Sequence, residues 1–115
     1  MGSEVLNPVE IEAAIRECAK RIHNGVKVVT AAESEARAKR REYDLAFAMA
    51  YKQNQGPAHE KRYAAEIATT EDRETAEVAE IAFRHAERTA RAVEAELRAW
   101  QSVGASVRTM YGAHQ

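Results

Sequence analysis

The sequence contains few residues that interrupt helices and few that supply reactive side chains. Its 115 residues include two prolines, five glycines and one cysteine, and aromatic residues make up 6%. A lone cysteine, Cys18, excludes an internal disulfide and any cysteine-based zinc site, and it fits a reducing, cytoplasmic setting. No apolar run approaches the ~20 residues that cross a bilayer, so we expect no membrane contact. At this length we expect a single helical domain over residues 1–115.

Signals for catalysis are also missing. His23, His59, His85 and His114 show neither of the histidine spacings typical of metal sites, H-x-x-x-H and H-E-x-x-H. The scattered glycines form no phosphate-binding loop, and Cys18 lies on an apolar stripe that is typical of a buried small residue. Carboxylates on open helices lack the enclosed surroundings that shift a carboxyl pKa into the range needed for acid–base catalysis. We therefore expect no catalytic residue, no cofactor and no metal, which means that the protein is not an enzyme.

Alanine is abundant, with 24 residues, and charged residues make up 30%, a composition typical of long helices and coiled coils. Asn7-Pro8-Val9-Glu10 predicts a capped helix start, and Asn24-Gly25 predicts the end of that helix. Residues 26–29 predict an extended connector, and residues 53–57 predict a loop. We expect an all-α fold with a leader helix (7–24), a basic helix (30–53) that forms a hairpin with a short helix (58–69), and a long coiled-coil-like helix (71–112). Between the last two, residues 69–72 favour a short break, with a kink inside one continuous helix as the alternative.

The last helix carries a regular apolar seam. Its spacing alternates between three and four residues over five heptads, which is the pattern of a coiled coil. A helix this long cannot bury its seam against itself, so we expect copies of the chain to cover part of it in a homo-oligomer, with packing inside the chain as the alternative. The seam comprises Ala76, Ala79, Phe83, Ala86, Ala90, Val93, Leu97, Trp100, Gly104, Val107 and Tyr111. We expect the oligomer interface at Phe83, Val93, Leu97, Trp100, Gly104, Val107 and Tyr111.

Charge is unevenly distributed along the chain, although the net charge is only −1. Residues 37–62 contain seven basic and three acidic side chains, a local balance of +4, and aromatic residues are interleaved with them. Phosphate contacts combined with base stacking hold single-stranded nucleic acid in this way. The alternative is a solvated helix face beside buried rings. The candidate DNA-binding residues are Arg37, Lys39, Arg40, Arg41, Lys52, Lys61 and Arg62.

Two stretches carry a resemblance to a known family: the link "KRYAAEIATTEDRE" and the final "LRAWQSVGASVRTMYG". With the basic helix before them, they resemble UvsY-like recombination mediators of bacteriophages, over residues 30–112. The resemblance implies a ring-like homo-oligomer in the host cytoplasm that binds single-stranded DNA. It also implies two protein partners, a recombinase and a single-strand binding protein, and a role in DNA recombination. The matching DNA contacts are Arg40, Arg41, Lys52, Lys61 and Arg62, and the last helix supplies the oligomer contacts.

Two other functions use the same seam. One is a phage structural or assembly protein, of the adaptor or scaffold type, that does not bind DNA. The other is a small inhibitor of a host or phage enzyme. Because all three functions require the coiled coil, the basic section at residues 37–62 is the feature that distinguishes them.

Overall fold

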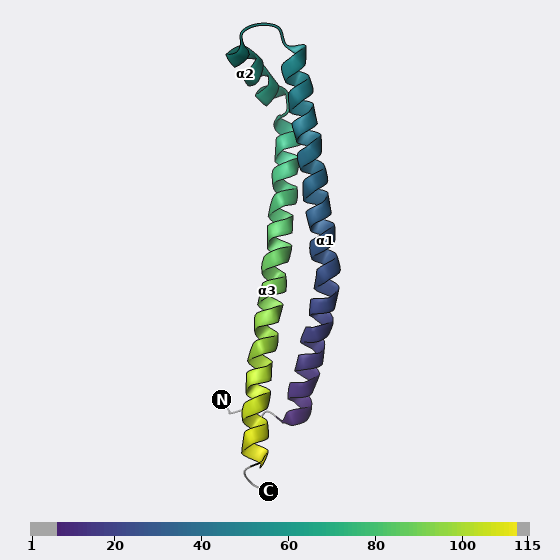
Figure 1. The fold of residues 1–115 in the computed structure, drawn as a ribbon, viewed down its shortest axis with the longest axis vertical. Coiled ribbons are helices and arrows are strands. Elements are labelled where there is room, and N and C mark those ends of the chain that lie inside the picture. The colour runs from purple at the N-terminus through teal and green to yellow at the C-terminus, as the bar shows by residue number, and fades with distance from the viewer. Residues whose placement is uncertain (1–6, 113–115) are drawn as a thin grey trace. The chain divides into compact units, whose positions relative to one another are not determined.

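The structure, a computed structural model, describes residues 7–112 and confirms the all-α fold. Three helices follow one another: α1 (Pro8–Gln53), α2 (Ala58–Ala68) and α3 (Thr70–Gly112) (Figure 1). No strand occurs between residues 7 and 112. Nearly all backbone hydrogen bonds of these residues are therefore made inside helices, and side chains decide which helix faces pack together.

The predicted start of the first helix is confirmed. Pro8 is the first residue of α1, where its missing N–H group costs no helical hydrogen bond. Asn7 caps the helix, because the backbone N–H of Glu10 donates to Asn7 Oδ1 at 2.9 Å. The capping chemistry of the sequence thus fixes where α1 begins.

The predicted end of this helix at Asn24-Gly25 is wrong, and so are the connector at residues 26–29 and the helix start at residue 30. α1 continues through all of them to Gln53. A glycine that ends a helix has a positive φ, and within residues 7–112 only Gly56 has one. An interior glycine costs only about 1 kcal/mol relative to alanine, which packing of the helix offsets.

The packing that carries α1 through Gly25 is a heptad seam. From Ile11 to Ala50 the side chains that are buried or half-buried recur at alternating spacings of four and three residues. Gly25 and Val29 occupy regular positions in this series, so a break there would interrupt the packed face. The seam comprises Ile11, Ile15, Cys18, Ile22, Gly25, Val29, Ala32, Ala36, Lys39, Tyr43, Ala46 and Ala50.

The turn between α1 and α2 and the junction between α2 and α3 were both predicted from sequence and are both present. Gly56 has a φ of 137°, a conformation that side-chain-bearing residues rarely adopt, and it reverses the chain after α1. At the junction, the hydroxyl of buried Thr69 donates to the carbonyl oxygen of Ala65 at 2.7 Å. The Thr69 N–H donates to the same oxygen at 3.1 Å, but Thr69 has a φ of −113° and a ψ of 21°, which are not helical, so α2 ends at Ala68 and α3 begins at Thr70.

Contacts between Cα atoms divide the chain into two compact units. The first unit contains the described residues up to Lys27 together with those from Glu87 onward. In it the start of α1 lies antiparallel to the end of α3, because Ile11 neighbours Gly104 while Arg21 pairs with Glu96 at 2.9 Å. Ile11, Cys18 and Val93 are buried in this unit and form its core.

The second unit is Val28–Ala86, and it contains the rest of α1, all of α2 and the start of α3. Its buried residues are mostly small: Ala36, Ala65 and Ala76, together with Phe83 and Thr69. Alanine at these positions lets helices approach closely but buries little apolar area per residue. Larger apolar side chains of this unit are consequently left on its outside, as described below.

Candidate interaction surfaces

The seam of α3 is turned inward within each unit. Phe83, Val93 and Gly104 are buried, and Leu97, Trp100 and Val107 are half-buried. In the first unit, a Cβ atom on Gly104 would lie 3.3 Å from Ile11 Cγ2, so α1 packs directly on this part of the seam. Packing inside the chain, the alternative left open by the sequence, accounts for this burial. Tyr111 alone among the seven predicted interface residues is exposed, and contacts between copies through the seam stay a prediction.

The predicted DNA-binding residues all lie in the second unit, and four of the seven pair with acidic side chains of their own helix. Arg37 pairs with Glu33 at 3.0 Å, and Arg40 pairs with Asp44 at 3.2 Å. Such exposed pairs are weak, about 0.2–1 kcal/mol each, but they leave only three of the seven cations without a neighbouring acid. The other two paired cations are Lys39, with Glu42 at 3.2 Å and Glu35 at 3.9 Å, and Arg62, with Glu66 at 3.8 Å.

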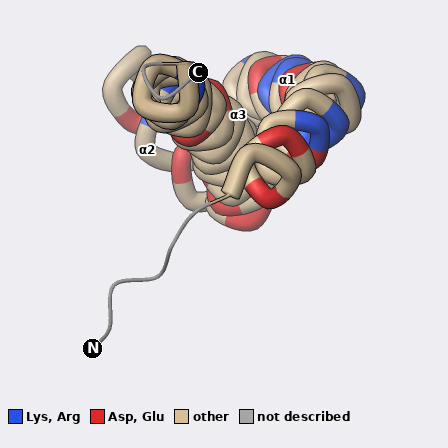
Figure 2. Tube along the Cα trace, turned by 90° about the horizontal axis from the view of Figure 1, so that it is seen from below, with Lys and Arg blue, Asp and Glu red and all other residues tan. Residues whose placement is uncertain are grey.

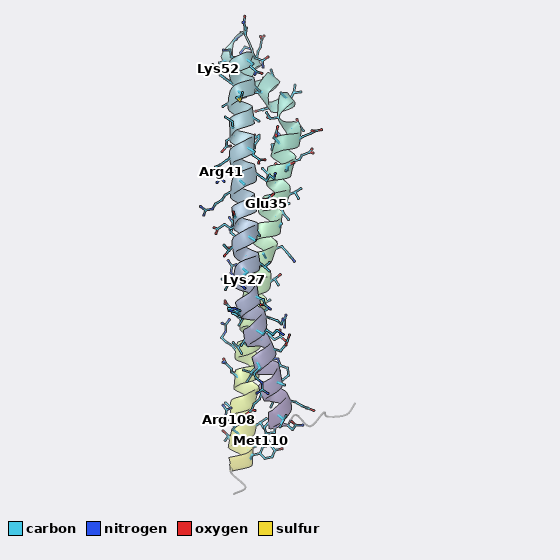
Figure 3. All side chains as sticks on the ribbon, turned by 90° about the vertical axis from the view of Figure 1, so that its right-hand side faces the viewer. Lys27, Glu35, Arg41, Lys52, Arg108 and Met110 are labelled. Atoms are coloured by element: carbon cyan, nitrogen blue, oxygen red, sulfur yellow. The ribbon has the colours of Figure 1, made fainter. Side chains whose placement is uncertain are left out.

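Arg41 and Lys52 differ from their neighbours because the side chain of neither makes an ion pair or hydrogen bond with any residue between 7 and 112. Both are exposed on α1, the helix on which Figure 2 shows several of the Lys and Arg positions. Figure 3 shows Arg41 extending from α1 and Lys52 close to the C-terminal end of that helix. They are the two exposed cations of the basic section without an acidic partner, whereas Lys61, which also lacks one, is half-buried against the ring of Tyr51.

Aromatic rings of the second unit are combined with cations from the same chain. The guanidinium of Arg40 lies 5.7 Å from the ring centre of Tyr43, and the ammonium of Lys61 lies 5.6 Å from that of Tyr51. Tyr43 and Phe47 are half-buried and meet edge to face at 6.3 Å, so these two rings contribute to packing. Tyr63 is the most exposed of the four and has Arg62 at 5.3 Å.

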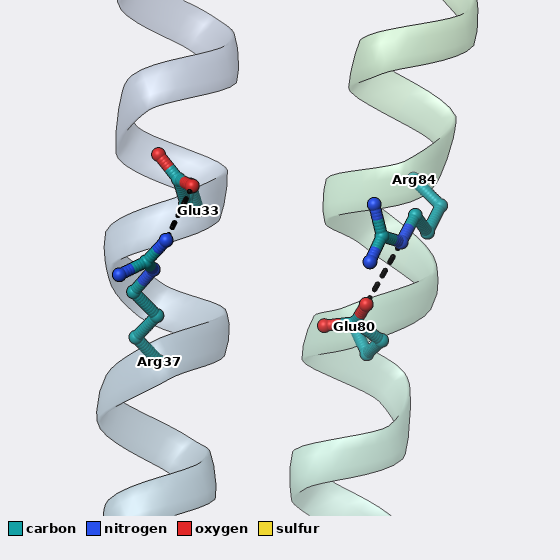
Figure 4. A network of polar contacts seen from close by, with 4 residues as sticks. All are labelled: Glu33, Arg37, Glu80 and Arg84. Atoms are coloured by element: carbon teal, nitrogen blue, oxygen red, sulfur yellow. Dashed lines mark hydrogen bonds and ion pairs between the residues drawn. The ribbon is translucent and has the colours of Figure 1, made fainter.

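An open groove of about 770 Å³ lies in the second unit between α1 and the start of α3. Its floor is alanine, and its rim carries charges that are already neutralised in pairs. Figure 4 shows two ion pairs of the unit, Glu33–Arg37 on α1 and Glu80–Arg84 on α3, the second at 2.9 Å. The groove is lined by Ala36, Arg40, Tyr43, Arg73, Ala76, Glu77, Glu80 and Ile81.

Several large apolar side chains of the second unit are exposed, including Ile67 of α2 at 77%, and on two helix faces they stand beside unpaired charges. On α1, Leu45 and Met49 are 63% and 53% exposed and lie one turn apart. Since Arg41, Leu45, Met49 and Lys52 follow at spacings of four, four and three residues, they share one side of the helix, which we call the α1 outer face. It combines two apolar side chains with a cation at either end.

The second such face lies on α3. Val78 and Ile81 are 66% and 65% exposed, and Glu71 and Glu74 precede them on the same side of the helix, at spacings of three, four and three residues. These four residues form what we call the α3 outer face. Within the described chain Glu71 and Glu74 make no ion pair, which sets them apart from Glu77 and Glu80 beside them.

No group of three or more His, Cys, Asp or Glu residues able to hold a metal ion occurs in the described part of the chain, and His114 lies outside it. The helices between residues 7 and 112 include none long and apolar enough to span a membrane. Comparison of the chain with protein-family models, with curated proteins and with solved structures found no match. Its function is therefore argued from its own surfaces.

The α3 outer face was missed in the sequence. Val78 and Ile81 are three residues apart, as a seam requires, but they are out of phase with the seam through Ala76 and Ala79. Two apolar series on one helix are the signal of a helix with neighbours on two sides. Leu45 and Met49 lie beside the packed face of α1, and their exposure shows that this side is left open.

Proposed function

We propose that the protein is a non-enzymatic assembly protein that associates with copies of itself through helix–helix contacts. The observation that supports it most is the exposure of Leu45 and Met49 on α1 and of Val78 and Ile81 on α3. Removing apolar surface from water stabilises a contact by about 25 cal/mol per Å². Clustered exposed apolar side chains are a feature of protein interaction sites, whereas scattered ones are ordinary surface.

The charge of the second unit also favours an assembly role over DNA binding. The basic section has a balance of +4 in sequence, but the structure brings it together with the acidic start of α3 and with Glu33 and Glu35. Over residues 28–86 there are nine Lys and Arg residues and eleven Asp and Glu residues, which gives a net charge of −2 for the unit. A net negative unit repels a phosphate backbone over distances longer than a single contact.

The direct test of the assembly role is a substitution on the α3 outer face. Val78→Lys with Ile81→Lys removes both apolar side chains from a face that is already exposed, so the helix itself should remain folded. We expect a lower mass in solution by light scattering, with unchanged helicity by circular dichroism. Ser102→Lys with Ser106→Lys, on exposed positions of α3 in the first unit, is the matched control. An oligomer of unchanged mass in the Val78/Ile81 variant contradicts the proposal.

A second candidate function, the recombination mediator, is favoured by a different observation. Lys52 is unpaired, and beside it Lys61 lies against Tyr51 while Arg62 lies against Tyr63, so cations and rings alternate where α1 meets α2. Rings of this kind stack on bases, each stack contributing about 1–3 kcal/mol. In this proposal the protein binds single-stranded DNA in the host cytoplasm and acts with a recombinase and a single-strand binding protein.

The mediator role is tested by fluorescence anisotropy of labelled oligo-dT, with duplex DNA as the control. Binding to the single strand that weakens steeply as salt rises is the result expected from phosphate contacts. Absence of binding at low salt, by protein with an intact helical spectrum, rules this function out and leaves the assembly role unaffected.

A further inference from the structure

We propose that the α1 outer face of one copy of this chain packs on the α3 outer face of another copy. The inference rests on the proposed assembly role and names the two surfaces that meet. Both faces belong to the second unit, so each copy carries one of each. The contact joins unlike faces, so it closes a two-fold dimer when the partner returns it and builds a ring or a filament when successive copies repeat it.

The apolar centres of the two faces match in size and spacing. Leu45 and Met49 are four residues apart, and Val78 and Ile81 are three residues apart, so each pair spans about one helical turn. All four side chains are more than half exposed. Ridges at spacings of three and four residues are the ones that interdigitate when two helices pack. Contact between the two apolar pairs therefore removes the side chains of both from water.

The charges at the edges of the faces are opposite in sign. Arg41 and Lys52 flank the apolar pair of α1, and neither has a partner within residues 7–112. Glu71 and Glu74 stand beside the apolar pair of α3, and they too have no partner there. The other charges that α1 and α3 carry in the second unit are paired on their own helix, as Arg40 is with Asp44, with the exception of Asp72. Unpaired cations thus collect on one face and unpaired anions on the other, which is the arrangement of complementary interfaces.

Charge also disfavours the two contacts in which like faces meet. Two α1 outer faces brought together with their apolar pairs in register place Arg41 and Lys52 of one copy beside those of the other. Two α3 outer faces place Glu71 and Glu74 against each other or against the apolar pair. Like charges directly opposed weaken an interface, and a carboxylate buried against apolar groups loses its hydration. In the mixed contact with the apolar pairs in register, Glu71 and Glu74 meet the cation at their own end, Arg41 or Lys52 according to the helix direction, and avoid both penalties there.

Two charge-reversed variants of the full chain test this pairing. In the first, Arg41→Glu with Lys52→Glu makes both outer faces acidic. In the second, Glu71→Lys with Glu74→Lys makes both basic. Each variant alone should associate at least about tenfold more weakly than the wild type, because like charges then oppose across every contact. Mixed in equal amounts, the two restore opposite charges at every contact, and sedimentation should show association returning in the mixture.

The controls separate this inference from the assembly role on which it rests. Reversal of two charges that already have partners on their own helix, Arg37→Glu with Glu33→Arg, should leave the mass unchanged. If either charge-reversed variant keeps the wild-type mass, or if the mixture stays dissociated while both variants are helical, the pairing of α1 with α3 is wrong. The assembly role then still stands provided that the wild type associates and Val78→Lys with Ile81→Lys dissociates it. A wild type that never associates overturns both.

Discussion

Gly104 of α3 lies so close to Ile11 of α1 that a Cβ atom on the glycine would be 3.3 Å from Ile11 Cγ2 and 3.9 Å from Ile15 Cδ1. This contact fixes the approach of the two helices in the first unit. A glycine at this seam position is therefore a packing requirement, although glycine is unfavourable in a helix by about 1 kcal/mol.

The first prediction concerns this close contact. Gly104→Leu adds a branched side chain where even one carbon is tight, so we expect the free energy of unfolding to fall by about 1–3 kcal/mol. Urea denaturation followed by circular dichroism measures the change. Gly112→Leu is the matched control, because a Cβ atom on Gly112 meets nothing within 4 Å. Equal effects of the two substitutions are inconsistent with the contact to Ile11.

The second prediction concerns the continuity of α1. A Cβ atom on Gly25 meets nothing within 4 Å, and Gly25 lies inside a helix, so Gly25→Ala should raise the free energy of unfolding by up to about 1 kcal/mol. Gly25→Pro should lower it by about 3 kcal/mol or more, because proline removes a helical hydrogen bond. A stabilising proline at this position would instead indicate a break in α1.

The helical pattern of this chain can be predicted from the sequence where the heptads are regular. The seam of α3 from Ala76 to Val107 is buried or half-buried at every predicted position. α1 has the same heptad pattern, but two of its seam positions are Gly25 and Lys39. Because neither residue has a large apolar side chain, the pattern is not evident in the sequence. Asn24-Gly25 also reads locally as a helix end. Tertiary packing overrides that local signal, and sequence alone does not show which helix supplies the packing.

The surfaces were less predictable than the helices. The basic section at residues 37–62 has a clear sequence signal, but ion pairs such as Arg37–Glu33 join it to acids that lie just outside the section. Charge counted over a stretch of sequence does not say which charges are neutralised. The separation of unpaired Arg41 and Lys52 from unpaired Glu71 and Glu74 becomes visible only when the pairs are known.

The third prediction distinguishes the two roles of the α3 seam. Trp100 is half-buried in the first unit, so Trp100→Ala should lower the free energy of unfolding by about 1–3 kcal/mol through lost apolar contact. We expect the mass of the assembled protein to be unchanged wherever the variant is folded. Thermal unfolding and light scattering on the same sample measure both quantities. A fall in mass without a loss of stability would show instead that Trp100 contacts another copy.

The fourth prediction concerns the cations available to DNA. If the protein binds single-stranded DNA, Arg41→Ala and Lys52→Ala should each lower the slope of log affinity against log salt by about 1, since each removes one phosphate contact. Arg37→Ala is the matched control and should have a smaller effect, because Arg37 pairs with Glu33 at 3.0 Å. Anisotropy titrations of oligo-dT at several salt concentrations measure the slopes. Identical slopes for all three variants are evidence against the mediator role.

The most direct test of the assembly role is the mass of the unmodified protein by sedimentation equilibrium, over a wide range of protein concentration and at low and high salt. We expect a mass above the 12.8 kDa of one chain that rises with concentration, because the outer faces of α1 and α3 bury apolar surface between copies. It should fall as salt rises from low to moderate concentration, since the complementary charges at the edges of these faces are then screened. A mass of 12.8 kDa at every concentration contradicts self-association and the contact between the two faces.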